Sequence, residues 1–242
     1  MTAPCEFLGW DTDFFGYRIG KSTVNELDQV RMDAIVAWCL ENAIDCLYFL
    51  ANPDHPQTAQ LLTANRFALV DIRLTLEKHD LATWQPFMPT MTIRPYHESD
   101  MPQLKAIARH SYRASRFYFD THFSEVICDA FYETWIEKSC HGYADEVLVC
   151  EIANQPVGFV TCSAKATNGN IGLVGVDASI RGKGIGYQLL MASMNWFHDR
   201  ACVTVDVVTQ GRNISAQRLY QRCGFMTKSV ELWYHFWTQN GK

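Results

Sequence analysis

Long apolar runs, paired cysteine motifs and an excess of basic charge are all missing from this chain of 242 residues. No segment reaches the roughly 18 consecutive apolar residues that a membrane-spanning helix needs, so we expect no membrane as a partner. With 21 lysines and arginines against 26 aspartates and glutamates, the formal net charge is −5 and the sequence pI is about 5.9. Such an acidic balance argues against nucleic acid as a partner.

Nine cysteines are spread along the chain without the spacing of a metal site or a disulfide framework. They stand at positions 5, 39, 46, 128, 140, 150, 162, 202 and 223 and form no CxxC pair. An odd number of cysteines without a secretory leader indicates reduced thiols. We therefore expect a cytoplasmic protein with no bound metal, in which most cysteines are small core residues.

The chain also lacks the sequence endings of two common phosphate-binding loops. Its glycine-rich segment, Arg181–Gly186, has no Gly-Lys-Ser/Thr ending, so a P-loop would lack its magnesium-binding hydroxyl. A dinucleotide site would need an acidic residue about 20 residues after the glycines. Asp206 lies at about that distance, but the glycine loop falls late in the chain and too few strand–helix units follow. A dinucleotide site is therefore the weaker interpretation.

What the chain does contain is a short apolar strand, a glycine loop and a helix in direct succession. The strand ends at Val174-Gly-Val176, the loop holds Gly182, Gly184 and Gly186, and an apolar helix follows. A helix N-terminus presents unpaired N–H groups and a partial positive charge, which together bind phosphate. Glycines let the backbone approach the anion. A strand-to-helix turn without a ligand is the alternative, and this segment alone leaves both open.

A second strand and a short helix follow the glycine loop. Asn213 is placed to cap a helix over about 214–223, and Gly224 suits the end of that helix. One face of this helix carries apolar residues at spacings of three and four, namely Ala216, Leu219, Tyr220 and Cys223. From Phe225 onward the pattern predicts a last strand that is aromatic to its end.

The glycine loop together with Asn213…Ala216…Leu219-Tyr220…Gly224-Phe225 resembles the acetyl-CoA-binding half of the GNAT N-acetyltransferase superfamily. The resemblance implies an acyltransferase with an α/β (α+β) GNAT fold, a mixed, mostly antiparallel twisted sheet with helices on both faces. Acetyl-CoA is the implied co-substrate. Its pyrophosphate would be held by the backbone of Arg181, Gly182, Lys183, Gly184, Ile185, Gly186 and Tyr187.

The same resemblance implies roles for four further residues. Val174 and Val176, on a strand splayed from its neighbour, would bond the pantetheine arm and the thioester. Asn213 would touch the CoA arm, and Tyr220 would be the catalytic general acid near the sulfur. A phenol with a pKa of about 10 can protonate a departing thiolate. A buried packing residue on its helix is the alternative for Tyr220.

A narrower resemblance is to N-acetyltransferases of dTDP-linked 4-amino-4,6-dideoxy sugars, and it covers most of the chain. Its matching places are Phe14-Phe15-Gly16, Ser115-Arg116-Phe117, Trp135-Ile136-Glu137, Thr209-Gln210 and Arg218…Tyr220. It implies transfer to the 4-amino group of a nucleotide-linked amino sugar. Another small amine, a peptide N-terminus and a non-catalytic acyl-CoA-binding module are the alternatives.

Acceptor binding is expected in the loop that contains Ser115, Arg116 and Phe117. With the neighbouring Arg113, Arg116 could clamp a diphosphate, because a guanidinium fork matches phosphate geometry. A solvated loop with an aromatic plug is the alternative. No general base stands out: the candidates are Asp177, Glu133, His122 and a water relay. The oligomeric state is open, with a homodimer among the assemblies considered.

The length suggests one large domain or two moderate ones, and a hydrophobic fraction of 48% supplies a core. The segment His79–Thr90 breaks the periodicity with two prolines and is typical of a linker. We therefore expect a smaller N-terminal domain at 1–82 and a catalytic, acetyl-CoA-binding GNAT domain at 90–240.

The N-terminal part echoes the C-terminal part in its order of elements. Leu61–Lys78 follows the same order of helix end, turn, phenylalanine and strand as Leu219–Tyr234. We interpret residues 1–80 as a partial, degenerate GNAT-like copy. It has no glycine phosphate loop, so it should not bind CoA. Coincidence is the alternative, because such endings are common.

Overall fold

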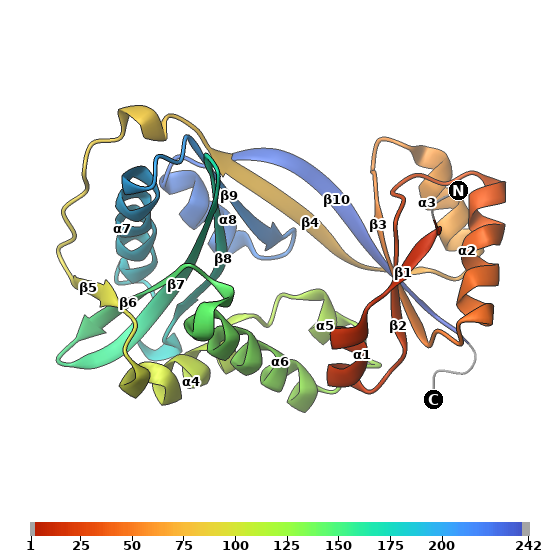
Figure 1. Ribbon diagram of the computed structural model, residues 1–242, viewed down its shortest axis with the longest axis horizontal. Helices are drawn as coiled ribbons and strands as arrows, with labels where there is room; N and C mark the ends of the chain where they lie inside the picture. Colours follow the sequence, from red (N-terminus) through yellow and green to blue (C-terminus); the bar gives the residue numbers. More distant parts are fainter. Residues whose placement is uncertain (1–2, 239–242) are drawn as a thin grey trace. The chain divides into compact units, whose positions relative to one another are not determined.

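The computed structural model describes residues 3–238 and divides into two compact units (Figure 1). The first unit comprises the described residues up to Arg73, the segment Ser115–Phe123, and the described residues from Val230 onward. The second comprises Leu74–Ala114 and Ser124–Ser229. These units are discontinuous, whereas the expected domains at 1–82 and 90–240 follow the chain order. The division into those two domains stays a prediction.

The sheet of the second unit is mixed and mostly antiparallel, as predicted. Its strand order is β4-β9-β8-β7-β6-β5. Pairing is antiparallel from β5 to β8 and parallel between β8 and β9. The strands are β4 (Ala68–Lys78), β5 (Thr92–Pro95), β6 (Glu146–Ile152), β7 (Gln155–Lys165), β8 (Asn168–Val176) and β9 (Thr204–Gln210).

Helices cover both faces of that sheet. A Cβ on Gly158 of β7 would lie 3.1 Å from Leu189 of helix α7 (Ile185–Asp199). A Cβ on Gly175 of β8, which is paired with the next residue of β7, would lie 3.0 Å from Ile107 of α4 (Met101–Ser111). Because neighbouring strand residues point to opposite faces, α7 and α4 lie on opposite sides. Helix α6 (Glu125–Lys138) packs against α4.

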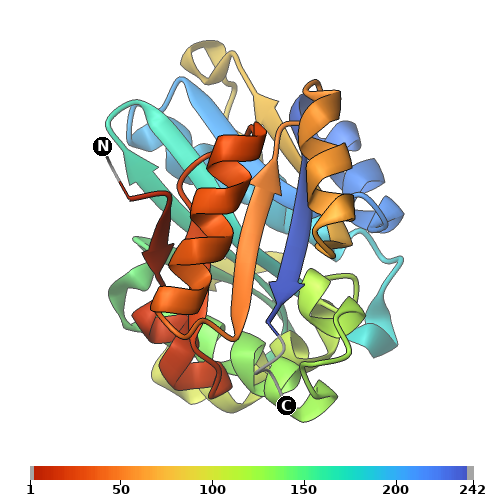
Figure 2. The same cartoon turned by 90° about the vertical axis from the view of Figure 1, so that its right-hand side faces the viewer.

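The first unit is built on strands in the order β1-β2-β3-β10. They are β1 (Cys5–Phe7), β2 (Ile19–Ser22), β3 (Cys46–Ala51) and β10 (Met226–Trp237), with β2 and β3 parallel and the other pairs antiparallel. Helices α2 (Gln29–Glu41) and α3 (Pro56–Ala64) lie on one face of β3 and β10 (Figure 2). Their apolar side chains, Met32 and Leu62 among them, form one core with Phe49 and Tyr234 from the strands.

The opposite face of β3 and β10 carries the segment Ser115–Phe123, which includes α5 (Arg116–Phe119). Phe117 is buried, and its ring lies 5.0 Å from that of Phe15, the last residue of α1 (Gly9–Phe15). Packing between aromatic rings therefore holds the segment Ser115–Phe123 in place. This segment lies far from β3 and β10 in the sequence.

Most expected elements of the second unit form where the sequence predicts them. Helix α8 runs over Ile214–Arg222, and the side chain of Asn213 caps it by accepting a hydrogen bond from the Ala216 N–H at 3.2 Å. Gly224 follows with a φ of +84°, a value that suits a helix stop without a Cβ. Within residues 3–238, no helix is long and apolar enough to cross a membrane. Within the same residues, none of the nine cysteines forms a disulfide.

Candidate active site

The strand expected to bind pantetheine is open along one edge. β8 pairs with β9 only from Asn168 to Ile171, although both strands continue beyond that point. On its other edge β8 stays paired with β7 as far as Val176. The last part of β8, which contains the half-buried Val174, therefore diverges from β9. A splayed strand is what the family resemblance implies here, and its free edge offers backbone groups to an extended ligand.

The glycine loop continues from β8 into α7 through one short 3₁₀ turn, η4 (Ala178–Ile180). Gly182 and Gly184 have φ values of +82° and +81°, and Gly184 is the N-cap of α7. Residues with a Cβ rarely adopt such a φ, so two of the three glycines are needed by the backbone itself. The loop is exposed from Arg181 to Gly184, and it leads into the N-terminus of α7, where the first N–H groups of a helix have no partner within the helix.

The third glycine, Gly186, serves close helix packing. A Cβ at this position would lie 2.9 Å from Leu219 Cδ2 on α8. The first turn of α7 is therefore pressed against α8. Tyr220 belongs to the hydrophobic cluster of this unit, and Val174 and Val176 pack against the same cluster. The predicted pantetheine strand, the start of α7 and helix α8 thus meet around one core.

The two cations of the loop differ in their contacts. The Arg181 side chain donates to the Val176 carbonyl at 3.2 Å and to the His110 carbonyl at 3.4 Å. Arg181 therefore ties the loop to the end of β8, in addition to supplying charge. Lys183 is exposed. Tyr187 is half-buried, and its ring lies 6.0 Å from Phe87.

Tyr220 and Asn213 occupy opposite ends of α8. Tyr220 is 5% exposed, and burial, together with the nearby Cys223 thiol, raises the pKa of its hydroxyl above the usual value. The phenol therefore keeps its proton at neutral pH. Asn213 Oδ1 is occupied by the Ala216 N–H and by the Ser215 hydroxyl, which makes Asn213 a structural cap.

The three side chains considered as general bases all have partners. Asp177 accepts from the backbone and the side chain of Ser179, and these bonds lower the pKa of its carboxyl. Glu133 forms an ion pair with Arg109. His122 lies 2.7 Å from a carboxylate oxygen of Asp120.

The residues expected to bind the acceptor lie in the first unit. Ser115 and Phe117 are buried, and the guanidinium of Arg116 lies 4.3 Å from the centre of the Phe117 ring. Arg113 belongs to the second unit, where it forms ion pairs with Asp129 and Glu125 of α6. Arg113, the second arginine of the expected diphosphate clamp, is thus already paired with carboxylates of α6.

Sequence reasoning missed a polar network that is built around Asp120. Its carboxylate accepts hydrogen bonds from His235 Nδ1 at 2.6 Å, Trp237 Nε1 at 2.8 Å and His122 Nδ1 at 2.7 Å. Burial raises the pKa of this carboxyl, but the three side-chain hydrogen bonds outweigh burial and leave the pKa below its usual value. Asp120 is therefore ionised. Two of the three partners, His235 and Trp237, are 115 and 117 positions away along the chain, so no local pattern could reveal them.

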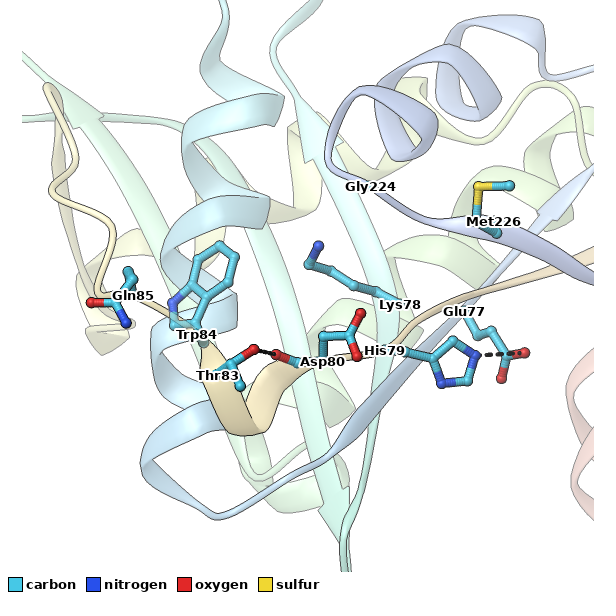
Figure 3. Close-up of a pocket in the computed structure, with 9 residues that line it drawn as sticks. All are labelled: Glu77, Lys78, His79, Asp80, Thr83, Trp84, Gln85, Gly224 and Met226. Atoms are coloured by element: carbon cyan, nitrogen blue, oxygen red, sulfur yellow. Dashed lines mark hydrogen bonds and ion pairs between the residues drawn. The ribbon is translucent and has the colours of Figure 1, made fainter.

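A cavity of about 290 Å³ lies elsewhere in the second unit, near the end of β4 and the start of β10 (Figure 3). The ammonium of Lys78 points between Gly224 and Trp84, and lies 5.6 Å from the tryptophan ring. No residue of the glycine loop or of β8 lines this cavity. In the described part of the chain, no cluster of three or more histidine, cysteine or acidic side chains could hold a metal ion.

Comparison with known proteins points in the same direction as the loop geometry. The chain is 25% identical to the dTDP-fucosamine acetyltransferase of Escherichia coli over 96% of its own length and 98% of that protein. It is 26% identical to the spore coat polysaccharide biosynthesis protein SpsD of Bacillus subtilis over 62% of its length, and spans about half (52%) of that relative. The first of these matches confirms the narrower resemblance described above.

The fold has relatives among solved structures. A GCN5-related N-acetyltransferase from Sphaerobacter thermophilus superposes with a TM-score of 0.69 at 16% identity, over 96% of this chain and 76% of that one. This likeness confirms the predicted fold. The model of the Acetyltransferase (GNAT) family matches residues 103–225, about half of the chain, which include the whole glycine loop and α8. The chain therefore belongs to the GNAT acetyltransferase family, and its predicted class, an acyltransferase, is confirmed.

Proposed function

We propose that this protein is an N-acetyltransferase that moves an acetyl group from acetyl-CoA to the 4-amino group of a dTDP-linked 4-amino-4,6-dideoxyhexose. The proposed acceptor is supported by the match to dTDP-fucosamine acetyltransferase, which extends over 96% of this chain. The observation that supports the donor is the open edge of β8 leading into the glycine loop.

In this proposal the second unit holds the donor. The backbone N–H groups from Arg181 to Tyr187 bind the pyrophosphate, because a helix N-terminus carries a partial positive charge. Val174 and Val176 bond the pantetheine arm backbone to backbone. An N–H donor on this strand edge also stabilises the negative charge that develops on the thioester oxygen during transfer. Asn213 borders the CoA arm.

Tyr220 is the proposed general acid. Transfer of the acetyl group to an amine leaves a thiolate on CoA, and that thiolate needs a proton. Burial keeps the Tyr220 phenol protonated at neutral pH, so the proton is present when the sulfur departs. The proposed acceptor-binding residues are Ser115, Arg116 and Phe117. Arg116 supplies a positive charge next to the buried ring of Phe117.

An acceptor screen tests the proposal. The protein is incubated with acetyl-CoA and a panel of amines that includes dTDP- and UDP-linked 4-amino sugars and a short peptide. Thiol release is followed together with the mass of the product. The matched negative control is dTDP-glucose, which offers a hexose without an amine. We expect acetylation of the dTDP-linked 4-amino sugar and no turnover with dTDP-glucose.

Each other outcome of the screen identifies a different activity. Transfer only to the peptide would replace the sugar nucleotide with a peptide N-terminus as the acceptor. Binding of acetyl-CoA without thiol release for any amine would describe a non-catalytic acyl-CoA-binding module. Cellular location and a homodimer stay predictions that this screen does not address.

A further inference from the structure

One face of the first unit's sheet contains buried polar atoms that have no hydrogen-bond partner among the residues the structure describes. They are the hydroxyls of Tyr48 and Ser115, Arg116 Nε and His235 Nε2. Tyr48 and His235 are each 1% exposed, and Ser115 is 3% exposed. Burying such atoms without partners costs free energy, and a water or a ligand that pairs with them removes that cost.

These four residues form one group. Tyr48 on β3 and His235 on β10 are directly opposite in the strand pairing, and their rings stack with centroids 4.6 Å apart. The Arg116 guanidinium lies 4.8 Å from the Tyr48 ring and 4.3 Å from the Trp233 ring. Ser115 precedes Arg116 in the chain. The unpartnered atoms are therefore neighbours contributed by two strands and the segment Ser115–Phe123.

His235 can only accept a hydrogen bond at its unpartnered nitrogen. Asp120 is an ionised carboxylate, so His235 Nδ1 must carry the proton that is donated to it. Burial lowers the pKa of His235 to about 4, against the opposite effect of the Asp120 bond, so the ring is neutral at pH 7. Nε2 then has a free lone pair, and Asp120 is the positioning residue that fixes this tautomer.

The ligand that completes the group must both donate and accept. Arg116 Nε donates and needs an oxygen, whereas His235 Nε2 accepts and needs a hydroxyl or an amine. A fully ionised phosphate cannot donate to His235. Asp11 also interacts electrostatically with Arg116, so an acidic side chain already acts on this guanidinium. Neutral hydroxyl groups therefore fit better than phosphate oxygens.

We propose that Tyr48, Ser115, Arg116 and His235 bind the hydroxyl groups of the acceptor's sugar ring, and that Tyr48 and His235 thereby help to determine acceptor specificity. This inference rests on the proposed function, because it assumes that the acceptor is a sugar nucleotide. It assigns the arginine to the sugar, in contrast to the diphosphate clamp expected from the sequence.

The test uses substitutions that remove an unpartnered hydroxyl and nothing else. Tyr48→Phe and Ser115→Ala are compared with Tyr234→Phe, a matched control on the same sheet whose ring packs in the core on the opposite face. Calorimetry measures the binding of dTDP-4-amino-4,6-dideoxygalactose and of dTDP, both without acetyl-CoA. Urea unfolding of each variant is measured in parallel.

We expect each of the two test substitutions to weaken binding of the sugar nucleotide about two- to tenfold, the effect of one lost neutral hydrogen bond, and to leave dTDP binding unchanged. Tyr234→Phe should bind both ligands as the wild type does. Tyr48→Phe and Ser115→Ala should be no less stable than the wild type, because each hydroxyl has no partner in the folded protein. A purely structural role would not separate binding from stability in this way.

The contrary results are distinct from one another. If the wild-type protein binds the sugar nucleotide and both test variants bind it equally well, this inference fails and the proposed function stands. If the variants lose dTDP and the sugar nucleotide to the same extent, the group contacts the nucleotide and the assignment to the sugar is wrong. A wild-type protein that binds neither ligand overturns the proposed function, and with it this inference.

Discussion

Acidification from pH 7 to pH 5 should destabilise the protein through His235. Burial lowers the pKa of this imidazole to about 4, whereas in the unfolded chain it returns to about 6.5. Between these two values the unfolded state binds a proton that the folded state does not, so stability falls as the pH falls. Each pH unit in this window is worth about 1.4 kcal/mol, and the loss from pH 7 to pH 5 is about 2 kcal/mol.

The surroundings of His235 account for that shift. Asp120 favours the protonated ring through its hydrogen bond, whereas Arg116 and His122 disfavour it through their charges. Tyr48 covers one face of the ring. Desolvation is the largest effect and decides the direction. Asp120 contributes in a separate window, because its own lowered pKa affects stability only as the pH falls below the usual range of a carboxyl.

Urea unfolding at half-unit steps from pH 7 to pH 5 measures this loss. The comparison variant is His235→Asn, which keeps a donor for Asp120 but does not titrate, and the matched control is His110→Asn, which removes an exposed imidazole. Averaged from pH 7 to pH 5, the pH slope of the wild type and of the control should exceed that of His235→Asn by about 1 kcal/mol per pH unit. Equal slopes for all three proteins would refute a neutral, buried His235.

Three substitutions test the proposed site residues. Tyr220→Phe keeps the buried ring, so the stability of the protein should be unchanged. The rate of acetyl transfer should fall about 10²–10⁴-fold at unchanged CoA affinity. Near-full turnover would show that Tyr220 is a packing residue. Gly184→Val should abolish CoA binding in calorimetry, since a β-branched residue is strained at a φ of +81° and its side chain blocks the pyrophosphate. Circular dichroism should show that this variant keeps its fold. Arg116→Ala should raise the acceptor KM about ten- to a hundredfold without changing the KM for acetyl-CoA; no change in either would remove the acceptor from this segment.

The glycine loop and helix α8 of the candidate site could be predicted because the residues that shape them lie close together in the sequence. The three glycines of the loop, the cap at Asn213 and the stop at Gly224 lie within one continuous stretch of the sequence. Most of them act on the backbone beside them: two loop glycines and Gly224 adopt a positive φ, and the side chain of Asn213 caps the helix that begins at the next residue. Spacing in sequence is therefore a direct guide to geometry in this region.

The composition of the first unit could not be predicted in the same way. The segment Ser115–Phe123 and the end of β10 join residues that precede Arg73, and this grouping depends on side-chain packing across large sequence separations. Antiparallel pairing of β10 with β3 brings Tyr48 to His235, which lies far along the chain. No periodicity within either strand indicates its partner.

The aromatic end of β10 explains why the sequence does not predict the polar group formed by His235 with Tyr48, Ser115 and Arg116. Leu232, Tyr234 and Phe236 alternate with Trp233, His235 and Trp237, so both faces of the strand are apolar and the pattern predicts a buried strand. A single histidine in such a strand can be a core-packing residue as well as a ligand-binding residue. Two observations separate these roles: the 2.6 Å bond from Nδ1 to Asp120, which fixes the tautomer, and the absence of any partner for Nε2 within residues 3–238. A histidine that served the core alone would not be held with a buried lone pair unsatisfied, because that arrangement costs stability and returns none.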